Sequence, residues 1–228
     1  MAGLGGAPMK LSDIRTRILE SLNDSASSPV FWSTTEMDDV IQEAQEVLAE
    51  ELALIKRWAL VPLREGATYY YTPPIATDIM APYRLTLTHL DRRLEVVTMG
   101  QLDERHEGWS TITGDPWHWF PVSWDLFGIF PHPTTAGGVM RLDYIAWPTE
   151  PQHDSESLEM PDPEQDAMVL YGVYDGLLKQ WDIQRALQIF ALFLQRIPKG
   201  QGRANVELQA SNVVRSFYRE SSKTGVSI

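Results

Sequence analysis

Hydrophobic periodicity divides the chain into a helical beginning, a β-rich middle and a helical end. The clearest helix is predicted over 33–58, where apolar residues recur three or four positions apart on one face. Ser33 and Glu36 have the spacing of a capping box at its start, and Lys56 and Arg57 suit the negative pole of the helix dipole at its end. The apolar face consists of Met37, Val40, Ile41, Ala44, Val47, Leu48, Leu52 and Ile55.

A shorter helix is predicted to precede this one. It starts at Leu11, and Ser12 is a residue type that commonly caps helix N-termini. The segment SASSP at 25–29 then interrupts the helical pattern. Its apolar stripe consists of Ile14, Ile18 and Leu22.

Further helices are predicted towards the C-terminus. Asp162 is expected to cap one of them, with Pro163 at the first helical position, where no backbone N–H is needed. A second amphipathic run is expected to end at Pro198, followed by a turn over 199–203 and a last helix over 204–220. The first of these helices carries Met168, Tyr171, Tyr174, Leu177, Leu178 and Trp181 at helical spacing.

The middle of the chain reads as short strands separated by proline and glycine. About five or six strands are expected between 60 and 148, in the segments ATYYYTPP, YRLTLTHL, RRLEVVTMG, FGIFPHP and GVMRLDYIAW. The last segment alternates well, with one face formed by Met140, Leu142, Tyr144 and Ala146. These strands predict a small antiparallel sandwich or barrel.

The order of segments predicts an α+β fold, in which N- and C-terminal helices form a bundle that carries an inserted antiparallel β-sandwich or barrel. An acidic connection, PTEPQHDSESLEMPDPEQD, is long for a loop and suggests a functional arm or a domain junction. The predicted division comprises a flexible N-terminus over 1–10, bundle helices over 11–59, the β domain over 60–150, the connection and C-terminal helices over 151–218, and a tail over 219–228.

Composition narrows the functional classes. The chain has 228 residues, no cysteine and a formal net charge of −12. Because no signal peptide and no apolar run of about 18 residues is present, we expect a soluble protein of a reducing compartment without a membrane partner. Residues 1–178 hold 11 basic and 28 acidic side chains, a net of −17, whereas residues 179–228 hold 8 and 3, a net of +5. The basic end suits DNA, an acidic protein surface or a solvated helix face.

No catalytic, metal or cofactor constellation emerges from the motifs. The five histidines, His89, His106, His118, His132 and His153, form no metal-binding pair, and no GxSxG nucleophile motif occurs. The segment PKGQGR lacks the spacing of a phosphate-binding loop. Glu43, Glu46 and Glu50 on the predicted 33–58 helix lie off its apolar face and are interpreted as solvated charges. We therefore expect a protein that is not an enzyme.

Aromatic residues cluster within about two dozen positions of the β-rich region. They are Trp109, Trp117, Trp119, Phe120, Trp124, Phe127 and Phe130. Rings of this kind fill a small β core, anchor protein interfaces or stack on sugars, and all three interpretations stay open here.

The order and spacing of these segments resemble the head-to-tail adaptor (connector) proteins of tailed bacteriophages. The matching pieces are LSDIRTRILESLND, FWSTTEMDDVIQEAQEVLAEEL, FGIFPHPTTAGGVMRLDYIAWPTEP and LEMPDPEQDAMVLYGVYDGLLKQ. The resemblance implies a dodecameric ring without catalysis or cofactor, which lies between the portal and a tail or nozzle protein and continues the DNA channel without binding DNA specifically. It implies a virion protein of the neck, present in the host cytoplasm during assembly.

The resemblance also implies two interaction sites. Portal docking is expected from the C-terminal segment, with Arg215, Phe217, Tyr218, Arg219, Lys223 and Ile228 as candidates. Subunit or tail contacts are expected from Trp109, Trp117, Trp119, Phe120 and Trp124. The alternative function is a carbohydrate-binding or other tail-associated binding module that uses the tryptophan-rich β domain.

Overall fold

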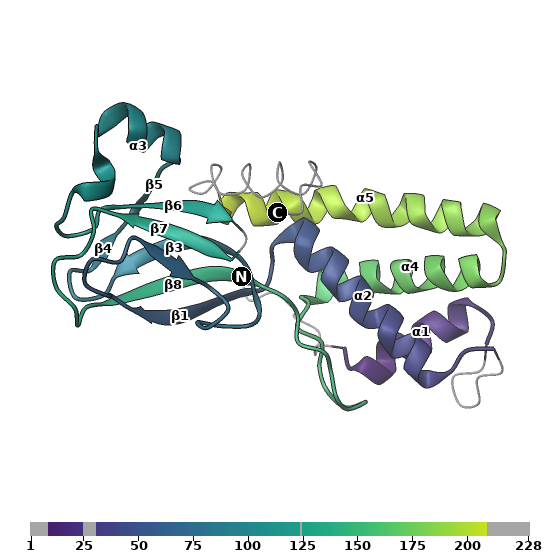
Figure 1. Ribbon diagram of the computed structural model, residues 1–228. Coiled ribbons are helices and arrows are strands. Elements are labelled where there is room, and N and C mark those ends of the chain that lie inside the picture. The colour runs from purple at the N-terminus through teal and green to yellow at the C-terminus, as the bar shows by residue number, and fades with distance from the viewer. Residues whose placement is uncertain (1–8, 25–30, 124, 209–228) are drawn as a thin grey trace, which may run out of the picture. The chain divides into compact units, whose positions relative to one another are not determined.

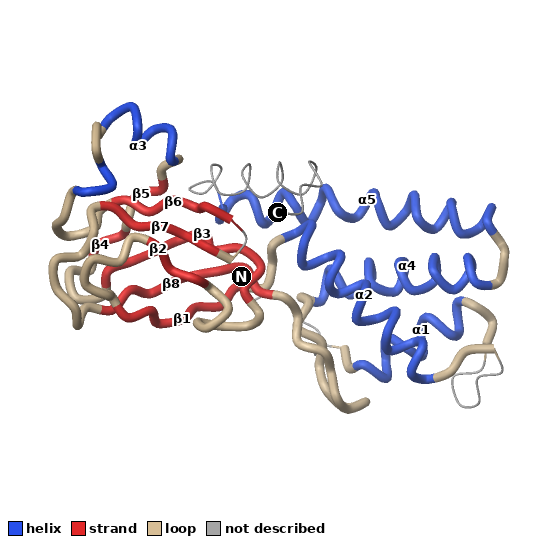
Figure 2. Tube along the Cα trace, viewed as in Figure 1, coloured by secondary structure: helices blue, strands red, loops and turns tan. Residues whose placement is uncertain are grey.

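The computed structural model describes residues 9–24, 31–123 and 125–208 (Figure 1). The chain forms two compact units, each described separately below. The helical unit combines the described residues up to Ile55 with Trp147–Glu207, and the sheet unit comprises Lys56–Ala146. Figure 2 shows the helices and strands along the trace.

The first helix, α1, spans Leu11–Ser21 and buries Leu11, Ile14, Ile18 and Leu19. Its N-cap is Lys10, so the prediction that Ser12 caps it was wrong. The physical reason is that other groups accept hydrogen bonds from the first backbone N–H groups of α1. The Asp13 carboxylate accepts the Lys10 N–H at 3.2 Å, and the N–H groups of Leu11 and Ser12 donate to the carbonyls of Glu156 and Asp154.

The second helix, α2, spans Thr34–Leu52 and confirms the predicted capping box. The Glu36 N–H donates to Ser33 Oγ at 3.2 Å, and the Ser33 N–H donates to Glu36 Oε2 at 2.9 Å. The helix ends earlier than predicted, because Ala53 adopts a left-handed conformation with φ of 52°. Lys56 and Arg57 therefore lie in a strand and not at the helix end.

In the part of the chain that the structure describes, eight strands form two four-stranded sheets, where five or six strands were predicted. The first sheet has the order β1-β8-β3-β4 and the second β2-β7-β6-β5. All pairs are antiparallel except β5 with β6, so the prediction of a purely antiparallel structure was wrong at this pair. Within the described residues the strands form two separate ladders and no closed barrel. The strands are β1 Lys56–Pro62, β2 Tyr69–Tyr71, β3 Ile79–Leu87, β4 Arg92–Arg93, β5 Glu95–Val96, β6 His118–Ser123, β7 Leu126–Phe130 and β8 Val139–Ala146.

Strand β8 confirms the alternation read from the sequence. Met140, Leu142, Tyr144 and Ala146 are buried, whereas Arg141 between them is exposed. The neighbouring strand β1 runs antiparallel along the full length of β8, from Lys56 opposite Ile145 to Pro62 opposite Val139. This pairing places the first and last strands of the sheet unit side by side.

An aromatic core fills the sheet unit. Gly128 on β7 lies opposite Phe120 on β6, and a Cβ at Gly128 would approach the Phe120 ring to 2.2 Å, so the ring covers the space that the glycine leaves. Phe120 also packs with Trp109 and Phe130 beside a short helix, α3 (Met99–Arg105), which the sequence pattern did not predict.

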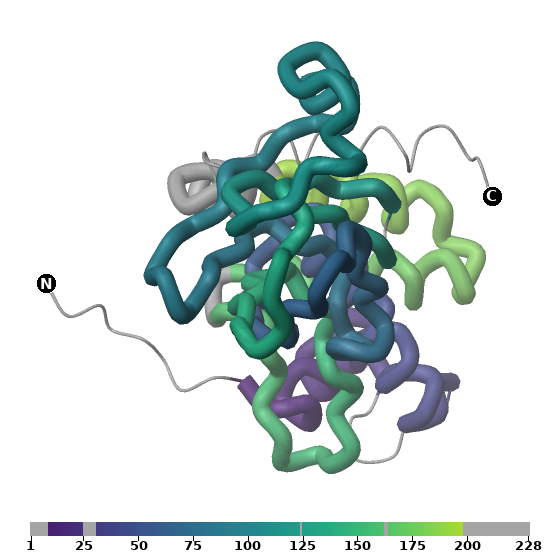
Figure 3. The backbone as a smooth tube through the Cα atoms, turned by 60° about the vertical axis from the view of Figure 1, so that its left-hand side comes forward, coloured from purple at the N-terminus to yellow at the C-terminus, as the bar shows by residue number. Residues whose placement is uncertain are grey.

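The acidic connection packs against the start of the chain. Lys10 and Ser157 form an isolated β-bridge, and the Leu158 N–H donates to the Met9 carbonyl. Leu158 and Met160 are buried, and Figure 3 shows the connection beside α1. The connection is therefore anchored to the helical unit along part of its length.

Two long helices complete the helical unit. α4 spans Asp162–Lys179, with Pro161 as its N-cap, so the helix begins one residue earlier than predicted. α5 spans Ile183–Leu208 and runs through Pro198, which corrects the predicted end at Pro198 and the predicted turn over 199–203. A proline removes one backbone hydrogen bond, and the bonds of the neighbouring turns sustain the helix. Trp181 lies in the α4–α5 turn with φ of 61°, and not on α4.

Candidate interaction surfaces

The predicted site residues fall into three groups. The portal-docking candidates Arg215, Phe217, Tyr218, Arg219, Lys223 and Ile228 lie outside the described residues, as does Trp124. Trp109, Trp119 and Phe120 are buried in the sheet unit, where they fill its core. Trp117 is 43% exposed and stacks on His118 at 4.4 Å between ring centroids.

The burial of these aromatic rings weighs against the alternative that the β domain binds sugars. A sugar platform needs exposed ring faces. Among the described members of the predicted aromatic interface set, only Trp117 is exposed. The core interpretation therefore accounts for most of the cluster, and an interface role for Trp117 stays a prediction.

His118 is buried beside this exposed ring. Its Nδ1 lies 3.7 Å from Glu95 Oε2, and burial lowers the pKa of the His118 imidazole. The described residues contain no group of three or more side chains that is suited to hold a metal ion. His118 is thus a packed aromatic residue, and the hydrogen-bonding capacity of its ring nitrogens is only partly used.

The outer surface of α5 was not identified from the sequence. Four large aliphatic side chains are about half exposed there, at 47% to 59% of their surface, and Trp181 in the preceding turn is 84% exposed. Exposed arginines at 185 and 196 lie on the same side of the helix as Leu192, whereas Ile183, Leu187 and Leu194 lie on the opposite side. The aliphatic residues are Ile183, Leu187, Leu192 and Leu194. The sequence did contain a signal for this exposed surface. The run IQRALQIFALFLQRI is apolar on more faces of the helix than a single packed interface covers.

α5 is held to α4 by aromatic contacts. Tyr174 packs on Phe190 at 4.6 Å between ring centroids, and Tyr171 packs on Phe193 at 5.4 Å. Phe193 and Ala186 are buried, so these positions face the helical unit. The exposed apolar residues and the two arginines of α5 consequently lie on the two sides of the helix that flank its packed face.

The outer surface of α2 is acidic. Five exposed carboxylates follow one another at spacings of three and four residues, which places them on one face of the helix. Their exposure confirms that they lie off the apolar face. We call this set the acidic ridge, and it consists of Glu36, Asp39, Glu43, Glu46 and Glu50.

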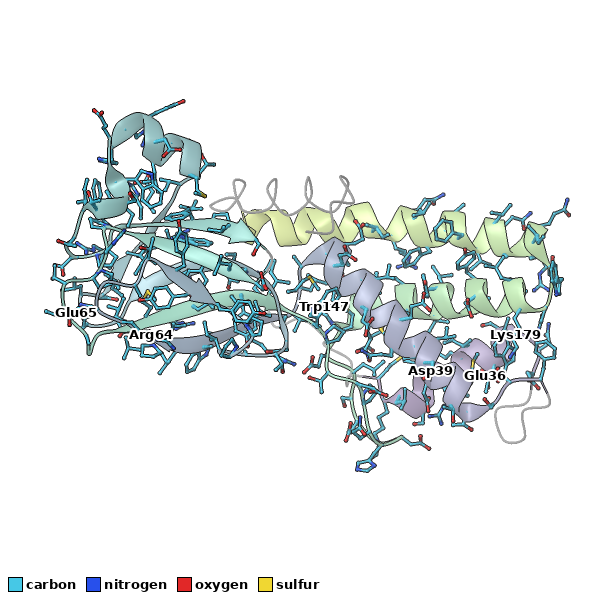
Figure 4. All side chains as sticks on the ribbon, viewed as in Figure 1. Glu36, Asp39, Arg64, Glu65, Trp147 and Lys179 are labelled. Atoms are coloured by element: carbon cyan, nitrogen blue, oxygen red, sulfur yellow. The ribbon has the colours of Figure 1, made fainter. Side chains whose placement is uncertain are left out.

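α4 binds one edge of the acidic ridge. Lys179 Nζ donates to Glu36 Oε1 at 2.5 Å, and the two residues lie side by side in Figure 4. The bonds from Lys179 and Ser33 lower the pKa of Glu36 to about 2. The Tyr171 hydroxyl donates to Glu43 Oε1 at 2.7 Å, and burial together with this carboxylate raises the pKa of Tyr171. Asp39 lies next to Glu36 on the exposed side of α2 (Figure 4).

The sheet unit has its own exposed apolar surface on the outer face of β1. Trp58 and Leu60 are 57% and 56% exposed, two residues apart on the same face of this edge strand. The Arg141 guanidinium lies 5.3 Å from the Trp58 ring centroid. Arg84 and Arg141 both bind the buried Asp143 carboxylate, at 2.7 Å and 2.8 Å. The two arginines thus place positive charge beside the exposed Trp58 and Leu60.

A hollow adjoins this strand. It has a volume of about 260 Å³ and is lined by Leu60, Val61, Pro62, Arg64, Tyr70, Tyr71, Pro74 and Ile75. Its lining is mostly aromatic, aliphatic and proline side chains, and no catalytic pair of side chains converges there. No helix of the described residues is long and apolar enough to span a membrane.

The fold and the surfaces together define a class of α+β binding protein. Each of its two units presents an exposed apolar surface flanked by charges. The family model described as SU10 adaptor protein matches residues 9–215, and the chain belongs to this family. This confirms the resemblance to phage head-to-tail adaptors. The family is structural and not enzymatic, and membership makes the chain a virion component that associates with other phage neck proteins. None of the curated proteins matches the chain.

Proposed function

We propose that this adaptor protein is a subunit of a ring between the portal and the tail or nozzle of a phage, and that the DNA channel continues through this ring. One observation carries the proposal: each unit of the chain presents its own exposed apolar surface, on α5 and on β1. An adaptor has to bind several neighbours at once, and exposed apolar surfaces of this kind mark binding sites. The dodecameric stoichiometry is the one that the family resemblance implies.

The proposed architecture is a helical bundle that carries the two sheets as an inserted sandwich. Its support is the chain order, since α1 and α2 precede Lys56–Ala146 and α4 and α5 follow it. In this proposal the units are also the domains, and residues 215–228 provide the portal-docking segment, which binds the portal during assembly in the host cytoplasm.

The acidic character of the chain suits a DNA channel. A wall of like charge repels the phosphate backbone, so DNA slides along it without specific binding. The net charge of −12 agrees with such a wall and offers no basic groove for DNA as a whole.

Electron microscopy of purified virions, and of the protein mixed with portal, tests the function. We expect ring density between portal and tail that fits this chain. Deleting residues 215–228 should abolish portal attachment while circular dichroism stays unchanged. Particles whose neck lacks the chain, or unchanged attachment after the deletion, would contradict the ring and the docking segment respectively.

A further inference from the structure

We propose that the basic face of α5 in one copy binds the acidic ridge of α2 in the next copy, so that the ring is built head to tail through the helical unit. This inference rests on the proposed ring and identifies the residues that form its subunit contact. The basic face is defined here as Arg185, Leu192 and Arg196.

The basic face is a continuous strip of α5. Its three residues are spaced by seven and four positions, and eleven residues make about three helical turns, so all three lie on one side. Leu192 is 48% exposed and the Arg185 side chain 56% exposed. Arg185 Nη1 also lies 3.5 Å from Asp182 Oδ2 of its own chain, an exposed pair of the kind that contributes little stability and can exchange for another carboxylate. The strip therefore presents two guanidinium groups about 17 Å apart with an apolar residue between them.

The acidic ridge has the same spacing. Asp39, Glu46 and Glu50 are also separated by seven and four positions, and so are Glu50, Glu43 and Asp39 in the reverse direction. Two helices laid side by side would thus match both arginines with carboxylates whether they run parallel or antiparallel. Leu192 would then lie against the aliphatic stem of Glu46 or Glu43.

Charge disfavours the pairing of either surface with itself. Pairing two copies of α5 would place arginine against arginine, and pairing two acidic ridges would place carboxylate against carboxylate, which costs free energy. Pairing α5 with α2 joins opposite charges. In the proposed ring this contact is heterologous, so that each copy uses α5 towards one neighbour and α2 towards the other.

Other occupants fit the basic face less well. Residues 209–228 contain Arg215, Arg219 and Lys223 against the single acid Glu220, so they have the same sign of charge as the basic face. DNA would satisfy the arginines through its phosphates, but a chain with a net charge of −12 repels the rest of the phosphate backbone. A second copy of the chain satisfies the arginines with carboxylates and places Leu192 against an aliphatic stem.

A charge swap tests the contact in assembled particles. Phage lacking the gene is complemented with full-length variants, and the chain is quantified in purified virions. Arg185→Glu with Arg196→Glu, and separately Asp39→Lys with Glu50→Lys, should each reduce incorporation about tenfold or more. Combining all four substitutions should restore incorporation, because the attraction is re-established with its signs exchanged.

A matched control reverses two exposed arginines of the sheet unit. Arg93→Glu with Arg105→Glu changes the net charge by the same amount and should leave incorporation unchanged. Normal incorporation of both reversed variants, or failure of the combined variant to recover, would overturn the contact. If only the α5 reversal prevents incorporation, the partner of α5 is another virion protein, and the copy-to-copy contact is also overturned.

Disulfide formation gives an independent readout, because the chain contains no cysteine. Leu192→Cys combined with Glu46→Cys reports a parallel contact, and Leu192→Cys combined with Glu43→Cys an antiparallel one. In oxidised virions one pair should give a ladder of linked copies, and each single cysteine should give none. Absence of a ladder from virions that contain both variants overturns the inference and leaves the adaptor function intact, whereas absence of the wild-type chain from virions overturns the proposed function itself.

Discussion

At the residue scale, the packing of α1 on α4 depends on two glycines. A Cβ at Gly172 would approach Ile18 Cδ1 to 2.4 Å, and a Cβ at Gly176 would approach Leu22 Cδ1 to the same distance. The four-residue spacing of these glycines creates a groove into which α1 fits. The two glycines therefore lower the helix propensity of α4 but allow a close contact between α4 and α1.

Gly172→Leu should destabilise the helical unit by about 2 kcal/mol or more, because an added side chain has no space beside Ile18. Gly100→Ala in α3 is the matched control, since nothing lies within 4 Å of its added Cβ. The control should be neutral or stabilise by up to about 1 kcal/mol through helix propensity. Urea unfolding measures both, and equal effects of the two substitutions would contradict the groove.

His118 should make the protein sensitive to mild acid. Burial lowers its pKa in the folded state, so the unfolded state binds more protons as the pH falls below about 6.5. Stability is therefore complete above this pH and decreases as the pH falls towards the folded-state pKa. His118→Phe should reduce the loss of melting temperature between pH 7.5 and 5.5, while His153→Asn, at an exposed position, should not. An identical pH profile for His118→Phe and wild type would disprove this role.

At the element scale, the start of α2 depends on its capping box. The Ser33 hydroxyl accepts the Glu36 N–H, and the Glu36 carboxylate binds both Ser33 and Lys179. Ser33→Ala should cost about 1 kcal/mol of unfolding free energy. Thr35→Ala, two positions further at an exposed site, should be close to neutral. Thermal denaturation followed by circular dichroism distinguishes them, and equal losses would argue against the cap.

Elements held by local signals were predictable from the sequence. The capping residues Ser33 and Glu36 are three positions apart, and the buried face of β8 follows from simple alternation. Features that depend on contacts between residues far apart in the sequence were not predictable. Arg84 binds Asp143 across 59 positions, and no local pattern reveals that this charge is buried.

The same distinction explains the errors at element ends. Lys56 and Arg57 resemble a helix terminus locally, yet their pairing with β8 places them in a strand. The surface of α5 was detectable as an excess of apolar residues, but the binding partner was not, because a single chain contains only one side of an interface. The C-terminal docking candidates stay predictions outside the described residues.

At the scale of the whole molecule, the two units should differ in their ability to fold alone. All described residues of the sheet unit except Leu208 form one continuous stretch, Lys56–Ala146, with its own aromatic core. We expect the excised stretch to unfold cooperatively, with the near-ultraviolet signal of packed tryptophans. The helical unit consists of two separate stretches, and residues up to Ile55 alone should stay largely unfolded, because α1 and α2 would lack α4. A fragment Lys56–Ala146 without cooperative unfolding would contradict this division.

The pairing of β1 with β8 also has a consequence for the nascent chain. Ile18 leaves the ribosome 154 residues before Gly172, its partner on α4, a delay of roughly 15 seconds at about 10 residues per second. The sheet unit is synthesised within that interval. Once it folds, Lys56 lies opposite Ile145, so the ends of the two helical stretches are brought together. The entropic cost of closing the long loop between α2 and α4 is then already met, and the late helices need only a short search to complete the helical unit.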